Sequence, residues 1–171
     1  NAFYDALVEI EGYRDLPVTQ AAQRVQRSGF PLAYADHEPE ARLIASALTG
    51  FTPRGFSCRL RDAQRPTQSG DDDDLTPAAG ALRGALGAQV VTEDPRIIGG
   101  TAGRGLEYTL SGPDAPRLAW ATAGWAVASA ASYDVVEISV EGSRWTRSNS
   151  GRGWITTATG VPSGSVQIRV G

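Results

Sequence analysis

The sequence contains no lysine and no methionine, and it has one cysteine and one histidine among its 171 residues. With no second cysteine the chain cannot form an internal disulfide, so we expect Cys58 to be a small, buried residue. With His37 alone, the usual zinc site of three or four ligands rich in His and Cys is disfavoured. The missing lysine also excludes a Walker-type phosphate loop, so the glycine-rich stretch Ile97–Gly105 is interpreted as a hairpin loop.

Basic charge is sparse as well. All sixteen basic residues are Arg, they are scattered singly along the sequence, and the formal net charge is −3. Nucleic-acid-binding proteins show a basic footprint that this pattern lacks, so we expect no nucleic-acid partner.

Long apolar runs are also missing. No stretch approaches the ~20 consecutive apolar residues of a membrane-spanning helix, and no secretory signal pattern occurs. Because the sequence holds no Met, we expect it to be a processed product or a fragment. An anchor or export signal would then precede Asn1.

The first part of the chain, residues 1–60, is predicted to be a small helical segment. Phe3, Leu7 and Ile10 follow the spacing of one apolar helix stripe. Thr19 is predicted to cap a second helix that buries Ala22 and Val25 and ends near Ser28.

A third helix is predicted after residue 37. Pro39 suits its first turn, and Gly50 suits the position just after its end. Its inward face is predicted to be Ala41, Ile44, Ala45 and Leu48. Three short helices with few large aromatics predict a thin core.

Residues 61–76 are predicted to be an acidic flexible linker. Four consecutive Asp, residues 71–74, repel one another and are surrounded by Pro, Ser, Gly and Gln. An alternative role in calcium binding is disfavoured because the spacing of an EF-hand loop and its distal Glu are missing.

Residues 77–171 are predicted to form an α+β domain, a small sandwich with one long Ala-rich helix on a mixed sheet. A short helix is expected from Thr76 to Gly87. Alternating apolar residues predict strands that bury Leu106, Tyr108 and Leu110; Val136, Ile138 and Val140; and Val166, Ile168 and Val170. The long helix, residues 115–134, is predicted to face the sheet through Leu118, Ala121, Trp125, Ala128 and Ser132.

The search for catalytic residues gives no strong candidate. His37 lies among Asp36, Glu38 and Glu40 at a predicted helix entrance, where a capping or surface role is more typical than metal binding. No G-x-S-x-G motif occurs, and no activating neighbour marks Cys58. We therefore predict no catalytic residue, no metal ligand and no cofactor.

The remaining candidates are ligand-binding residues near the C-terminus: Trp145, Trp154, Arg144 and Arg152. A Trp at a strand edge can stack on a sugar ring or insert into a partner. The burial tendency of large aromatics favours the alternative, in which both Trp residues close a small core.

A family resemblance is carried by Phe3-Tyr4, by "AAQ" and "VQRS" in residues 21–28, by Tyr34-Ala35 and by Glu38-Pro39. These residues resemble the tail of a lysozyme-like, transglycosylase-like domain found in actinobacterial exported or membrane-anchored proteins. The family's catalytic Glu lies upstream of the matching region, so no residue here inherits that role.

More loosely, "GWAVASAASYDVVEISVEGSRWTRSNSGRGW" resembles the C-terminal domain that follows in these proteins. Some relatives look like zinc D-Ala-D-Ala carboxypeptidases, with His ligands before and after the long helix. No His occupies either region here, so the resemblance implies a degenerate, pseudoenzyme-like domain.

The two resemblances together imply a non-catalytic binding or scaffolding module of the cell envelope, extracellular or attached to the cell surface. Peptidoglycan and another envelope protein are the partners implied. Two alternatives stay open. The chain could be the remainder of a peptidoglycan-cleaving muramidase or lytic transglycosylase, or a subunit of a larger surface assembly.

Overall fold

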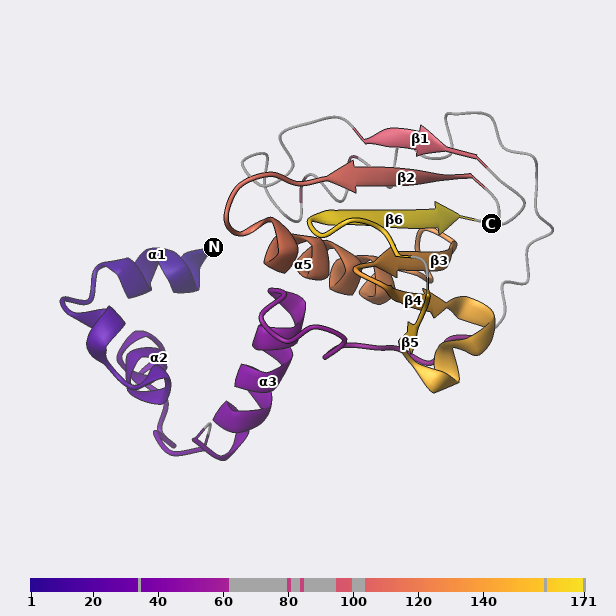
Figure 1. Cartoon of the computed structure of the whole chain (residues 1–171). Helices are drawn as coiled ribbons and strands as arrows, with labels where there is room; N and C mark the ends of the chain where they lie inside the picture. Colours follow the sequence, from indigo (N-terminus) through magenta and orange to yellow (C-terminus); the bar gives the residue numbers. More distant parts are fainter. Residues whose placement is uncertain are drawn as a thin grey trace. The chain divides into compact units, whose positions relative to one another are not determined.

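The computed structural model describes residues 1–33, 35–61, 80, 84, 95–99, 104–158 and 160–170. Contacts divide the chain into a helical unit, Asn1–Ile44, and an α+β unit, Ala45–Gly171. Figure 1 shows the order of the elements. The linker predicted at 61–76 and the short helix predicted at 76–87 lie outside the described residues, apart from Arg61, Gly80 and Gly84.

The helical unit consists of short helices. Its elements are α1 (Ala2–Val8), η1 (Tyr13–Asp15), α2 (Val18–Gln26), η2 (Ala35–His37) and the first part of α3 (Glu38–Leu48). Phe3, Leu7 and Ile10 are the least exposed residues of the first ten, but α1 ends at Val8, so the predicted stripe is confirmed for Phe3 and Leu7, and Ile10 lies beyond the helix. Among the described residues of this unit only Ala21 is buried, so its core is as thin as expected.

Two details of the predicted helices are wrong. α2 begins at Val18 with Pro17 as its N-cap, so Thr19 lies inside the helix. The left-handed conformation of Arg27 ends this helix, in agreement with the predicted end near Ser28. In α3, Ala47 is the buried residue, whereas Ala41, Ile44, Ala45 and Leu48 of the predicted face are exposed.

The α+β unit contains one antiparallel sheet and one long helix. The described strands are β1 (Arg96–Ile98), β2 (Arg104–Thr109), β3 (Val135–Val140), β4 (Ser143–Thr146), β5 (Ile155–Thr156) and β6 (Ser165–Val170), in the spatial order β1-β2-β6-β3-β4-β5. All pairs are antiparallel, which corrects the expected mixed sheet. The α+β class and the long Ala-rich helix are confirmed.

The strand patterns predicted most of the sheet. Leu106, Ile168, Ile138 and Trp145 lie opposite one another across four strands and are all buried. In β3 the buried residue at the start is Val135 and not Val136, because a register shift between Val135 and Glu137 inserts a residue. β3 and β4 are joined by Glu141 and Gly142, both with positive φ (41° and 67°), as a type I′ hairpin turn requires.

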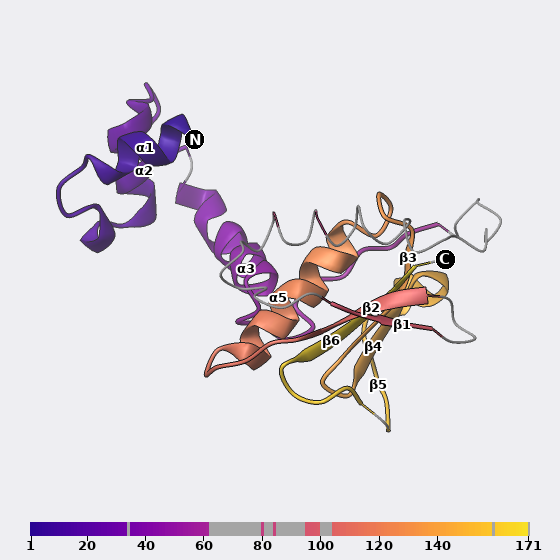
Figure 2. The ribbon, with the colours of Figure 1, turned by 90° about the horizontal axis from the view of Figure 1, so that it is seen from above.

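The long helix α5 (Ala115–Ala128) lies against one face of the sheet and packs on β3 and β6 (Figure 2). Its tightly packed residues are Ala119, Ala123, Ala126 and Val127, each at most 1% exposed. The predicted face is therefore wrong in part: Ala121 is buried, but Leu118 and Trp125 are half-buried and Ala128 and Ser132 are exposed. Small Ala side chains let the helix backbone approach the sheet, so they occupy the closest contact.

Residues 45–61 belong to the α+β unit, which corrects the predicted extent of the helical segment, 1–60. Phe56, Cys58 and Leu60 pack against the core of the sheet and α5. The Leu60 amide donates to Ser150 Oγ at 2.9 Å, and Arg147 Nε donates to the Arg61 carbonyl at 3.0 Å. We call residues 45–61 the strap.

Candidate functional site

The four predicted ligand-binding residues do not converge on one site. Trp145 lies on β4 opposite Ile138, is 0% exposed, and belongs to the core. This corrects its candidate binding role, because a fully buried ring cannot stack on a ligand. Arg144, its neighbour on the strand, points to the opposite face of the sheet, where its Nη1 lies 3.8 Å from Glu137 Oε2.

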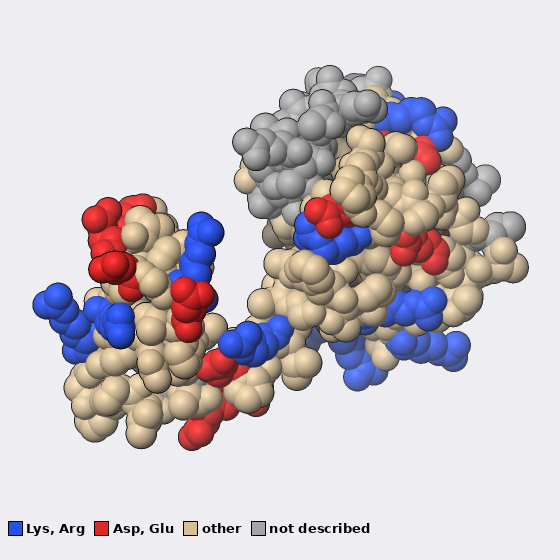
Figure 3. Space-filling view, turned by 60° about the vertical axis from the view of Figure 1, so that its left-hand side comes forward, with Lys and Arg blue, Asp and Glu red and all other residues tan. Residues whose placement is uncertain are grey.

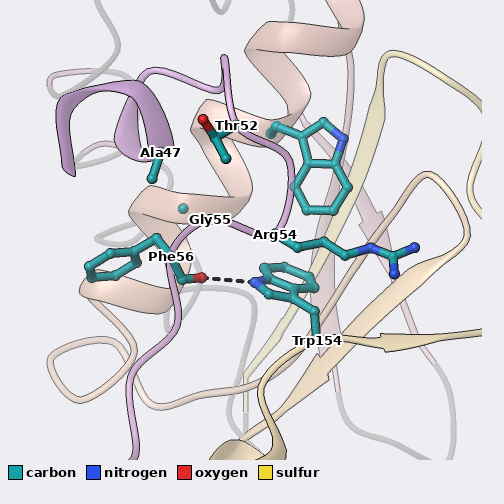
Figure 4. A pocket seen from close by; sticks show the side chains of 8 residues that line it. Ala47, Thr52, Arg54, Gly55, Phe56 and Trp154 are labelled. Atoms are coloured by element: carbon teal, nitrogen blue, oxygen red, sulfur yellow. Dashed lines mark hydrogen bonds between the residues drawn. The ribbon is translucent and has the colours of Figure 1, made fainter. Parts of the chain in front are cut away.

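Arg152 is the last residue of η4 (Arg147–Arg152), and Trp154 lies directly before β5, whose Ile155 pairs with Arg144. Trp154 is half-buried and its indole N–H donates to the Phe56 carbonyl at 2.8 Å (Figure 4). Its ring meets Trp120 edge to face, with centroids 5.3 Å apart. This geometry makes Trp154 an anchor for the strap. Arg152 is exposed.

A shallow surface depression adjoins this Trp pair, and its roughly 170 Å³ include open solvent. Small-molecule sites usually enclose about 300–1,000 Å³, so this depression is too small to hold an ordinary cofactor or sugar ligand. Its lining residues come from the strap, α5 and the segment before β5: Ala47, Thr52, Arg54, Gly55, Phe56, Trp120, Gly124 and Trp154.

The indole of Trp120 is hydrogen-bonded to the Glu141 carboxylate. Its indole N–H donates to Glu141 Oε2 at 2.7 Å, and Ser163 Oγ donates to Glu141 Oε1 at 2.6 Å. Glu141 thus connects α5 to the β3–β4 turn and to the segment before β6. Charge-assisted hydrogen bonds of this kind are stronger than neutral ones, so we assign Glu141 a stabilising role.

Glu141→Gln is expected to lower the free energy of unfolding by about 1 kcal/mol, because a neutral amide replaces the charged acceptor. The left-handed backbone of residue 141 disfavours Glu and Gln to the same extent, so the difference in stability between them reports the loss of the charge. Urea unfolding followed by circular dichroism measures it. Glu40→Gln, an exposed carboxylate of the helical unit, is the matched control; equal stability of the two variants would contradict this role.

His37 lies where the sequence places it, at the entrance of α3. Its Nδ1 is 3.9 Å from Glu40 Oε2, and both side chains are about three-quarters exposed. Glu38 pairs with Arg42 four residues later. In the part of the chain that the structure describes, no three His, Cys, Asp or Glu side chains gather as a metal-binding group. The calcium alternative at residues 71–74 lies outside that part.

Cys58 is half-buried against the core and is a free thiol. The stretch Ile97–Gly105 connects two strands, because Ile98 of β1 pairs with Gly105 of β2. This pairing agrees with a hairpin connection. Across the described residues, no helix has the length and apolar character needed to cross a membrane.

Comparison with protein-family models, curated proteins and solved structures gives no match. The lysozyme-like and carboxypeptidase-like resemblances therefore stay predictions.

Sequence reasoning missed the strap, although a signal was present. Phe56, Cys58 and Leu60 alternate with Ser57, Arg59 and Arg61, the period-two pattern of an extended segment with one buried side. The alternation also turns Arg59 and Arg61 towards solvent, where both are exposed.

Proposed function

We propose that this chain is a non-catalytic binding and scaffolding module of an exported cell-envelope protein. The helical unit, Asn1–Ile44, binds a protein partner, and the α+β unit is the rigid body that carries it. The envelope location rests on the family resemblance, and the mode of binding rests on the surface of the helical unit.

One observation carries the proposal: the helical unit exposes its large apolar side chains. Phe30, Leu32 and Leu43 are 78%, 79% and 71% exposed. Further exposed apolar residues of the unit are Tyr4, Val8, Val18 and Ile44. Apolar surface concentrated in this way is typical of protein interaction sites, because burying it in an interface removes it from water.

A protein surface suits these residues better than a glycan does. Sugar rings are bound by exposed aromatic faces, but Trp145 is buried and Trp154 is packed against Trp120. In the helical unit the exposed aromatics Tyr4 and Phe30 are outnumbered by five exposed aliphatic side chains. Leu32 and Leu43 instead offer flexible aliphatic contacts of the kind that fill pockets on a folded partner. This comparison favours an envelope protein over peptidoglycan.

The test compares the wild-type chain with the double variant Leu32→Ser/Leu43→Ser. Envelope proteins are cross-linked to the immobilised chain through a photoreactive residue at position 30, and the captured protein is then purified and titrated. The Kd of the captured protein for the double variant is expected to be about tenfold or more higher than for the wild type. The reason is that each lost apolar side chain removes about 1 kcal/mol or more of binding free energy. Ile97→Ser, an exposed apolar residue of β1 in the other unit, is the matched control and is expected to bind as the wild type does.

Three results would overturn the proposal. The double variant binds as tightly as the wild type, or the chain sediments saturably with purified peptidoglycan and captures no protein, or it releases soluble fragments from peptidoglycan. The second result would favour wall binding and the third would favour the enzyme alternative. Light scattering measures the mass of the chain in solution, and a mass above that of the monomer would favour the alternative of a larger surface assembly.

A further inference from the structure

Charge is distributed unevenly along the chain. Residues 45–61 and 142–171 contain seven Arg and no Asp or Glu, although the net charge of the whole sequence is −3. The other residues therefore carry all nineteen acidic side chains. The individual arginines are separated in sequence, which is why the composition alone indicated no basic footprint.

The fold brings the two Arg-bearing stretches together. The strap runs along η4 and β5: the Leu60 amide and carbonyl both bond to Ser150 Oγ, and Arg54 Nη1 donates to Thr156 Oγ1 at 3.2 Å. The Arg59 guanidinium lies against Gly151, so close that a Cβ there would be 3.2 Å from Nε. Figure 3 shows Arg side chains grouped along the lower edge of the α+β unit with no acidic side chain among them. Arginines that are scattered singly in the sequence are thus grouped at this edge by the fold.

Three arginines of these stretches have carboxylate partners within the fold. Arg147, whose side chain is 13% exposed, bonds to Asp134 Oδ1 at 2.9 Å and to the Ala130 carbonyl. Arg144 and Arg169 both face Glu137, at 3.8 Å and 3.7 Å. All three arginines contribute to the fold through these pairs.

The other arginines of this region are exposed, and we call Arg54, Arg59, Arg61 and Arg152 the arginine edge. Within the described residues none of the four has a carboxylate partner, and Arg54 bonds only to the neutral Thr156 hydroxyl. Like charges held on one rigid edge repel one another, and an external polyanion relieves that repulsion.

We propose that the arginine edge binds a flexible anionic polymer whose charges are phosphodiesters. The planar guanidinium group matches a phosphate with two parallel N–H donors. A polymer with repeating charges engages several arginines along the edge at once, and the release of its counterions drives the binding.

The surroundings of the edge favour a hydrophilic polymer over a lipid surface. Membrane-binding surface elements combine basic residues with apolar ones that enter the headgroup region. Among the described residues of the strap and of 142–170, the exposed large hydrophobic side chains are Leu48 and Phe51, and the Phe51 ring lies under the Arg117 guanidinium, 4.8 Å from its Cζ, so it is engaged within the fold. Phe56, Leu60 and Trp154 are packed against the core instead.

The test titrates the intact chain into fluorescently labelled poly(glycerol phosphate) and follows anisotropy at several salt concentrations. Each phosphate contact contributes about 0.7 to the slope of log K against log salt, so three contacts give a slope of roughly −2. Arg59→Gln/Arg61→Gln/Arg152→Gln is expected to lose this part of the slope and to bind at least about tenfold more weakly at low salt. Arg152→Gln alone is expected to reduce the slope by about one contact.

The matched control is Arg14→Gln/Arg24→Gln/Arg27→Gln, which removes the same charge from exposed positions of the helical unit. It is expected to keep the wild-type slope. The Lys triple variant at positions 59, 61 and 152 is expected to retain most of the binding, which separates charge from folding. Circular dichroism verifies that every variant is folded.

Equal losses in the two Gln triple variants would overturn the proposal, because net charge alone would then explain binding. So would the absence of polymer binding at low salt, or edge-dependent binding to phosphatidylglycerol vesicles without binding to the polymer. Single-stranded DNA serves as a second phosphodiester probe; tighter binding to DNA than to the base-free polymer would show that bases are recognised and would also overturn it. The Leu32→Ser/Leu43→Ser variant is expected to bind the polymer as the wild type does. Polymer binding therefore tests the arginine edge independently of the proposed protein partner.

Discussion

Trp145→Ala is expected to lower the free energy of unfolding of the α+β unit by about 3–5 kcal/mol, as large-to-small changes of buried aromatics do. The ring is 0% exposed and lies in the row of buried residues that crosses β2, β6, β3 and β4. Its removal leaves a cavity beside Ile138 that the rigid sheet can close only in part. Urea unfolding followed by far-UV circular dichroism measures the loss.

The control for this prediction is Trp145→Phe. The Trp145 indole N–H is buried and has no hydrogen-bond partner in the described structure. Phe removes that unsatisfied donor together with part of the volume, so the two effects oppose each other and the expected loss is about 1 kcal/mol. Equal stability of Trp145→Ala and the wild type would contradict the core position and would reopen a binding role for this Trp.

The strands were predictable because each buries one face. The alternation of Leu106 and Tyr108 in β2, continued by Leu110 just after it, fixes which side faces the core, and all three are buried. The exception, Val135 in place of Val136, follows from a local insertion in the β3–β6 pairing. Such a bulge depends on the partner strand, which the sequence of β3 alone does not describe.

The orientation of α5 was harder to predict. The helix is apolar nearly all round, so its pattern does not identify one face. The large residues Leu118 and Trp125 favoured a predicted inward face that is wrong in part. The close fit of Ala119 and Ala123 to the sheet decides the face instead, and closeness of approach is a tertiary property.

Of the two candidate binding surfaces, one could be predicted from the sequence and the other could not. The thin core of the helical unit could be predicted from its short helices, and the exposed Leu32 and Leu43 follow from it. The arginine edge could not be predicted, because Arg59 and Arg152 are 93 positions apart in the sequence. The docking of the strap on η4 is what brings them to one edge.

Gly50→Ala is expected to release the strap from α5 and to lower stability by about 3 kcal/mol. Gly50 has φ +82°, and a Cβ there would lie 1.9 Å from the Arg117 carbonyl oxygen and 2.8 Å from the Ala121 amide nitrogen. Both atoms belong to the backbone of α5, so no rotamer change can make room. Hydrogen exchange of the strap amides and urea unfolding measure the effect.

Gly12→Ala is the matched control, because Gly12 has φ +69° but a Cβ there meets nothing within 4 Å. It isolates the cost of the left-handed backbone, about 1 kcal/mol, and the difference between the variants is the cost of the clash. Equal losses would contradict the close approach of the strap to α5. Because the strap carries Arg54, Arg59 and Arg61, Gly50→Ala is also expected to weaken binding of poly(glycerol phosphate), whereas Gly12→Ala leaves it unchanged. The packing of one glycine against a helix backbone would then control a charged edge that begins four residues further along the chain.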